Sequence, residues 1–131
     1  MSDAIAGLAH VNIRAPEALI ERVRDFYCDV IGLREGPRPP FRSRGHWLYA
    51  GERDVLHLTV DPHVERKDGD GWLDHVAFSA TDLDATIARL EAAGIAYERD
   101  DVPSLDQVQL FLADPAGIGV ELNFAMRGNK P

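Results

Sequence analysis

Alternating apolar and polar positions recur in this chain as two pairs of matching segments. Residues 8–13, Leu-Ala-His-Val-Asn-Ile, match residues 73–78, Leu-Asp-His-Val-Ala-Phe, at an offset of 65 (75 − 10). Residues 55–60, Val-Leu-His-Leu-Thr-Val, match residues 119–124, Gly-Val-Glu-Leu-Asn-Phe, at an offset of 64 (121 − 57). Alternation of this kind is typical of strands with one buried face. We therefore expect two copies of one structural unit.

Each copy contains a helical pattern followed by further strand patterns. The spacing of apolar residues predicts helices over 16–31 and 82–93, which end at Gly32 and Gly94. Thr81 and Asp84 resemble a capping box before the second helix. Further strands are predicted over 44–50, 54–60, 96–101, 107–113 and 118–124, with hairpin turns at 51–54 and 114–117. The proline-rich stretch 36–40 is expected at an edge or in a loop, because proline lacks a backbone N–H.

This order of elements predicts an α+β fold made of two βαβββ modules. We expect a single domain over 1–131, with module one at about 7–60, a linker at 61–72 and module two at about 73–124. A chain of 131 residues can bury one full core but is too short for two independent domains of ordinary size.

Strand periodicity places four polar residues away from the faces that pack against the helices. His10 and His75 are equivalent in the repeat, and so are His57 and Glu121. Val55 is expected to share the face of His57. A lone histidine on a strand is more often a hydrogen-bonded residue than a ligand. Four such residues at equivalent positions predict one divalent transition metal in a cleft between curved mixed sheets, with zinc, iron, nickel, manganese and cobalt all open.

Four motifs carry a resemblance to a known family. They are Leu-Ala-His-Val at 8–11, Phe-Tyr-Cys-Asp-Val-Ile-Gly-Leu at 26–33, Leu-Asp-His-Val-Ala-Phe at 73–78, and Asp-Pro-Ala-Gly at 114–117 before the strand with Glu121. Over about residues 7–124 the chain resembles the vicinal oxygen chelate superfamily, which includes glyoxalase I, fosfomycin-resistance proteins, methylmalonyl-CoA epimerase, extradiol dioxygenases and metal-free bleomycin-resistance proteins. The resemblance implies paired βαβββ modules, often in a homodimer, with a metal that binds neighbouring substrate oxygens.

The resemblance implies metal chemistry but does not fix the reaction. Because the chain is small and has four apparent ligands, we expect a metal-dependent lyase or isomerase of glyoxalase type. His10, His57, His75 and Glu121 would be the ligands, and Glu121 or His57 the candidate proton carriers. Glyoxalase-type members normally have Glu, and epimerases often Gln, at the position of His57, so this residue departs from both. An extradiol-type dioxygenase and a binding protein of resistance type remain the alternatives.

Cationic and aromatic residues gather in and beside the loop of module one and suggest a substrate site. They are Arg38, Phe41, Arg42, Arg44, Trp47 and Tyr49. Such a set suits an anionic or aromatic small molecule. The alternative is a solvated charge cluster beside core aromatics.

Charge and composition narrow the partners and the compartment. A net charge of -8 argues against nucleic acid and anionic membranes. Because the chain has neither an apolar run of about 20 residues nor a signal-peptide pattern, and because its only cysteine is Cys28, we expect a cytoplasmic location.

Overall fold

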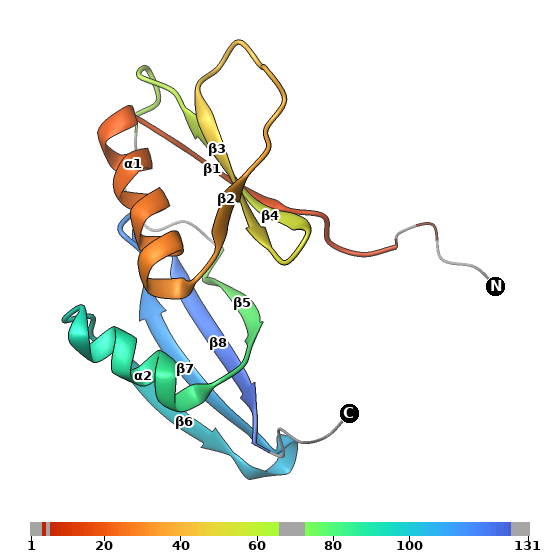
Figure 1. Cartoon of the computed structure of the whole chain (residues 1–131), viewed down its shortest axis with the longest axis vertical. Coiled ribbons are helices and arrows are strands. Elements are labelled where there is room, and N and C mark those ends of the chain that lie inside the picture. The colour runs from red at the N-terminus through yellow and green to blue at the C-terminus, as the bar shows by residue number, and fades with distance from the viewer. Residues whose placement is uncertain (1–3, 5, 66–72, 127–131) are drawn as a thin grey trace. The chain divides into compact units, whose positions relative to one another are not determined.

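The computed structural model describes residues 4, 6–65 and 73–126. The chain divides into two compact units, Met1–Arg66 and Lys67–Pro131, and each holds one sheet and its helices (Figure 1). Of the predicted linker, residues 61–65 are described, and 66–72 lie outside the described residues. Across the described ranges, the helices are too short or too polar to cross a membrane.

Module one follows the predicted order of elements. A π-helical segment at Phe26–Ile31 continues its α-helix. Its sheet has the order β1-β4-β3-β2, in which β1 runs parallel to β4 and the other neighbours are antiparallel. The bounds are β1 Val11–Ala15, α1 Glu17–Asp25, β2 Arg34–Gly36, β3 Gly45–Ala50 and β4 Arg53–Val60.

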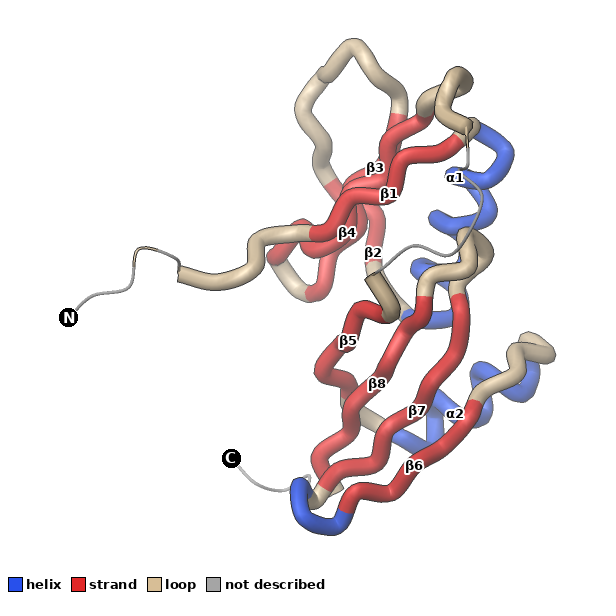
Figure 2. Tube along the Cα trace, turned by 180° about the vertical axis from the view of Figure 1, so that it is seen from behind, coloured by secondary structure: helices blue, strands red, loops and turns tan. Residues whose placement is uncertain are grey.

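Module two repeats this topology. Its sheet has the order β5-β8-β7-β6, again with one parallel pair, β5 and β8 (Figure 2). The bounds are β5 His75–Ala80, α2 Leu83–Ala92, β6 Glu98–Val102, a 3₁₀ turn Pro103–Leu105, β7 Gln107–Ala113 and β8 Gly119–Ala125. The predicted α+β fold class with two βαβββ modules is therefore confirmed.

Buried and partly exposed residues alternate along the strands, and this alternation determines on which face a candidate ligand lies. In β8 the side chains of Val120, Leu122 and Phe124 are buried, whereas those between them, including Glu121, are only partly covered. In module one the helix residues Ile20 and Val23 and the strand residues Leu48 and Leu58 are 1% exposed or less. Because each helix side of the sheet is filled by apolar residues, polar side chains are left for the opposite face.

Local details differ from the predictions at two helix ends. The α-helical part of the first helix ends at Asp25, and Gly32 ends the π-helical segment with φ 102, a left-handed conformation that glycine adopts without strain. The second helix is capped by Asp82 and not by Thr81, because the Asp82 carboxylate accepts a hydrogen bond from the Ala85 amide at 3.1 Å. As predicted, the proline-rich stretch lies outside the sheet interior, and β2 is an edge strand.

Candidate metal centre

In module one, His57 lies at the centre of a stack of three rings. Its ring centroid is 4.0 Å from that of Trp47 and 3.7 Å from that of His10, and the planes are inclined by 8° and 15°. His57 is 9% exposed, whereas His10 is exposed and immediately precedes β1. The Asn12 amide donates to the carbonyl of His57 at 3.1 Å and connects β1 to β4 beside the stack. The structure thus brings two of the four predicted ligands into direct contact.

A β-bulge adds a carboxylate that the sequence prediction missed. Leu48 pairs with Leu56, but the next residue of β3 pairs with Asp54, so that Val55 is the extra residue of β4. The bulge turns Asp54, and not Val55, toward His57. Asp54 Oδ2 lies 2.7 Å from His57 Nε2, and this hydrogen bond holds the pKa of Asp54 below its ordinary value.

Beside the ring stack lies an open pocket of about 480 Å³, whose lining includes His10, Arg38, Phe41, Trp47, Asp54 and His57. Arg38 lies over the Phe41 ring at 5.1 Å and donates two hydrogen bonds to Ser43, one to the carbonyl at 3.0 Å and one to Oγ at 3.1 Å. The Arg38 Nε is buried without a hydrogen-bond partner in the structure. A cation and flat rings on one pocket suit the anionic or aromatic ligand expected from the sequence.

Three of the predicted substrate residues do not line this pocket. Arg44 forms an ion pair with Glu17 of α1. Tyr49 donates its hydroxyl hydrogen to the carbonyl of Pro37. Arg42 lies exposed on the loop between β2 and β3. The loop therefore supplies Arg38 and Phe41 to the pocket, and β3 supplies Trp47.

Module two brings the other two predicted ligands together. His75 Nε2 lies 3.2 Å from Glu121 Oε1, and His75 Nδ1 lies 2.8 Å from Asp74 Oδ2. The hydrogen bond with Asp74 raises the pKa of His75 despite partial desolvation, and the charge of Glu121 adds to this. Gly119 permits the approach of β5 to β8, since a Cβ there would lie 2.9 Å from His75 Cβ and 2.6 Å from the Asp74 carbonyl oxygen. Sequence reasoning gave no role to Asp74 or Gly119, although Asp74 directly precedes a candidate ligand.

The His75–Glu121 pair fits a divalent metal. Both ring nitrogens of His75 face carboxylate oxygens, and either a proton or a metal ion could bridge Nε2 and Glu121. Two donors each about 2.1 Å from one ion are separated by about 3.0 Å at a right angle and about 3.4 Å at a tetrahedral angle. The observed separation of 3.2 Å lies between these values. Metal-bound histidines commonly donate their other N–H to a carboxylate, as His75 can to Asp74.

The two ligand pairs belong to different modules. Within the described parts of the chain, no three His, Cys, Asp or Glu side chains gather closely enough to hold a metal ion. Each module supplies two of the four predicted ligands, so the complete set of four stays a prediction.

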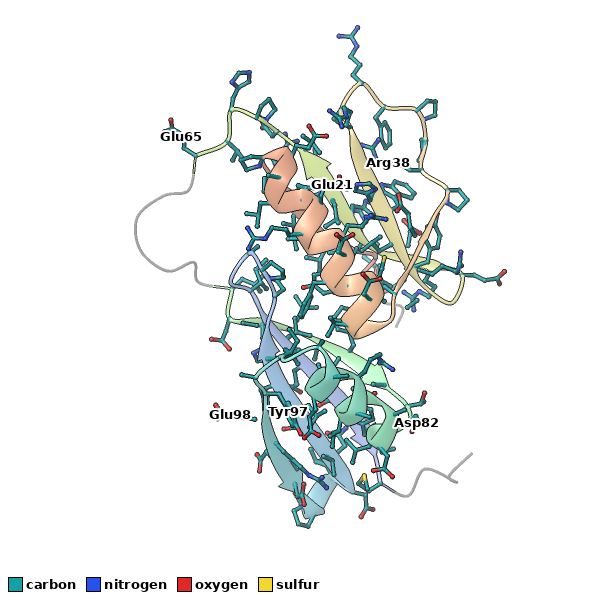
Figure 3. The ribbon with its side chains drawn as sticks, turned by 60° about the vertical axis from the view of Figure 1, so that its left-hand side comes forward. Glu21, Arg38, Glu65, Asp82, Tyr97 and Glu98 are labelled. Atoms are coloured by element: carbon teal, nitrogen blue, oxygen red, sulfur yellow. The ribbon has the colours of Figure 1, made fainter. Side chains whose placement is uncertain are left out.

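His46 on β3 is held by contacts within the fold. Its Nδ1 lies 2.6 Å from Glu35 Oε2, and its Nε2 lies 2.7 Å from Glu21 Oε2 on α1, the helix residue labelled in Figure 3. Burial lowers the pKa of His46, but the two carboxylates outweigh it, and the pKa is raised overall. His46 therefore joins α1 to the sheet and does not line the pocket of His57.

A family profile, Glyoxalase/Bleomycin resistance protein/Dioxygenase superfamily, matches residues 7–122 of the chain. The chain belongs to this superfamily. The uncharacterized protein YaeR of Escherichia coli (strain K12) is 30% identical in an alignment of 121 residues that covers 86% of this chain and 92% of YaeR.

Solved structures of other proteins share the fold. A glyoxalase family protein from Bacillus anthracis is 27% identical with a TM-score of 0.73, and the match covers 95% of this chain and 99% of that protein. The fosfomycin resistance protein FosX from Listeria monocytogenes is 13% identical with a TM-score of 0.66, over 92% of this chain and 93% of FosX. That FosX structure contains Mn(II) and dihydroxypropylphosphonic acid. At this identity the likeness to FosX is one of fold alone.

Proposed function

We propose that this protein is a metal-dependent enzyme of glyoxalase type, a lyase or isomerase that acts on a small substrate with neighbouring oxygen atoms. The observation that carries the proposal is the pair formed by His75 and Glu121, with Asp74 on the far nitrogen of the imidazole. The equivalent positions in module one hold His10 and His57 in contact. The presence of Mn(II) in FosX is consistent with a divalent metal in a protein of this fold.

The proposed ligands are His10, His57, His75 and Glu121. A bound metal would act as a Lewis acid that stabilises negative charge developing on substrate oxygens. Glu121 is the only anionic residue of this set, and Gln109 Nε2 lies 3.4 Å from its Oε2. Glu121 and His57 are the proposed proton carriers, because each combines a basic atom with a place beside the substrate oxygens in this arrangement.

The pocket beside His57 is the proposed substrate site. The Arg38 guanidinium offers a positive charge to an anionic group, and Phe41 and Trp47 offer ring faces to a flat one.

Two alternatives remain with observations behind them. If His57 stays hydrogen-bonded to Asp54 and does not bind the metal, the remaining ligands are two histidines and one carboxylate, namely His10, His75 and Glu121. This is the ligand type of non-haem iron oxygenases and of extradiol-type dioxygenases. If no metal binds at all, the aromatic pocket by itself suits a small-molecule-binding protein of resistance type.

Metal titration separates the enzyme from the binding protein. We expect about one divalent metal ion per site, taken up from zinc, iron, nickel, manganese or cobalt, and a higher melting temperature on binding. His75→Ala and Glu121→Gln should weaken binding, whereas His63→Ala, which removes an exposed histidine, should not. The proposal is wrong if elemental analysis and titration at neutral pH find neither binding nor stabilisation. If metal binds, turnover tests with 2-oxoaldehyde thiol adducts, catechols and acyl-CoA epimers separate the reaction classes.

We also propose that the protein is a homodimer in the cytoplasm. Each sheet, as far as it is described, ends in two strands with one unpaired side, β1 and β2 in module one and β5 and β6 in module two. Such edges need cover, and a twofold dimer can provide it. The metal site can then be built within one chain or across two. Sedimentation that finds only monomer at micromolar concentration contradicts this.

A further inference from the structure

We infer that Asp54 is a positioning residue that orients the imidazole of His57 so that Nδ1 is the nitrogen available to a metal ion or substrate. The inference rests on the proposed function only where it concerns the metal. It starts from the β-bulge at Val55, without which Asp54 would face the helix side of the sheet. The bulge places Asp54 Oδ2 2.7 Å from His57 Nε2.

Stacking on two rings and one hydrogen bond determine how the ring of His57 lies. Trp47 on one side and His10 on the other, at 4.0 and 3.7 Å, set the plane of the imidazole. Rings stacked at this distance leave no room for the imidazole to turn edge-on. Within that plane the hydrogen bond with Asp54 keeps the Nε2 edge of the imidazole toward the carboxylate. The ring is therefore held in both its plane and its in-plane direction.

The chemistry of the hydrogen bond identifies the tautomer. An ionised carboxylate can only accept a hydrogen bond, so in neutral His57 the proton must be on Nε2. The free electron pair is then on Nδ1, the nitrogen that can bind a metal or accept a proton. His75 has the opposite arrangement, since its Nδ1 faces Asp74 and its Nε2 faces Glu121. Asp54 and Asp74 thus play matching roles on opposite nitrogens of the two histidines.

The tautomer can be read directly in the metal-free protein. In a ¹⁵N-labelled sample at alkaline pH, long-range ¹H–¹⁵N correlation should show His57 protonated on Nε2 alone, with slow exchange of that proton. In Asp54→Ala we expect an Nδ1-protonated form to appear and the exchange to accelerate. Wild-type His57 with its proton on Nδ1, or an unchanged spectrum in the variant, overturns the inference.

Metal affinity gives the second measurement. Loss of an orienting carboxylate typically costs about 10- to 100-fold in metal affinity, which we expect for Asp54→Ala. Glu52→Gln removes a negative charge from the same hairpin without touching His57 and should change affinity by less than about twofold. In a His57→Ala background, Asp54→Ala should have no further effect, because its influence passes through the imidazole. Penalties that simply add, or an equal loss in Glu52→Gln, show that Asp54 acts only by its charge and overturn the inference.

The two measurements distinguish a failure of the proposed function from a failure of the inference on Asp54. If the wild-type protein takes up no metal ion, the proposed function is wrong, and the tautomer of His57 in the metal-free protein then decides on Asp54 by itself. If metal binds normally but His57 carries its proton on Nδ1, the proposed function stands and Asp54 has no positioning role.

Discussion

Gly45 at the start of β3 lies where a side chain cannot fit, and Gly45→Ala should therefore damage both the sheet and the pocket. A Cβ at this position would lie 2.0 Å from the carbonyl oxygen of Leu58, whereas real Cβ contacts are essentially never under 3.0 Å. The strands must move apart by about 1.0 Å (3.0 − 2.0) to relieve this contact. Leu58 is on β4, which is hydrogen-bonded to β1 and β3, so its carbonyl cannot move alone.

The cost can be worked from this geometry. Overpacking in a well-packed region costs about 1 to 3 kcal/mol, and the separation would weaken about two ladder hydrogen bonds worth about 1 kcal/mol each. We expect Gly45→Ala to lower the free energy of unfolding by about 3 to 5 kcal/mol, a large part of the 5 to 15 kcal/mol that is typical of a domain. The same Cβ would lie 3.1 Å from Arg38 Nη2, so ligand binding in the pocket should weaken as well.

Urea unfolding followed by tryptophan fluorescence measures the change, with a lower midpoint and an unchanged slope expected. Gly51→Ala is the matched control. Gly51 has φ 62 and no atom within 4 Å of a built Cβ, so the same substitution meets only backbone strain of about 1 to 2 kcal/mol. If Gly45→Ala costs no more than Gly51→Ala, the steric argument at β3 is wrong.

Three further outcomes are expected. Wild-type protein should turn over the methylglyoxal and glutathione adduct weakly or not at all, and His57→Glu, which restores the usual glutamate, should raise this activity; robust wild-type turnover contradicts our account of His57. Glu121→Gln should reduce activity more than His57→Gln does, because Glu121 is the only anionic proposed ligand. Burial lowers the pKa of His46, but Glu21 and Glu35 raise it overall, with Arg24 also facing Glu35. This raised pKa adds stability that is complete below about pH 6.5 and is lost as pH rises through the raised pKa. His46→Gln should flatten this pH dependence of the urea midpoint, and an unchanged pH profile would show that the network of His46 does not supply it.

The repeat and the elements followed from the sequence because both depend on local periodicity. The strand predicted over 107–113 is β7, Gln107–Ala113, and the second helix lies within one residue of its predicted bounds. The alternation of apolar residues in β8 correctly placed Glu121 on the face away from buried Val120 and Leu122. Within a regular strand, the face that a side chain occupies is a property of its position alone.

The β-bulge and the side-chain contacts depend on the tertiary structure, and sequence periodicity does not predict them. The bulge at Val55 arises from the pairing of β4 with β3, and it exchanged the expected Val55 for Asp54 beside His57. The contacts of long side chains could not be predicted from their spacing in the sequence. Arg44 forms an ion pair with Glu17, and Arg38 contacts Ser43 and Phe41. The sequence by itself determined which residues are equivalent, because equivalence is a repeat in the chain. Which of them meet depends on distances between strands, which only the packed fold defines.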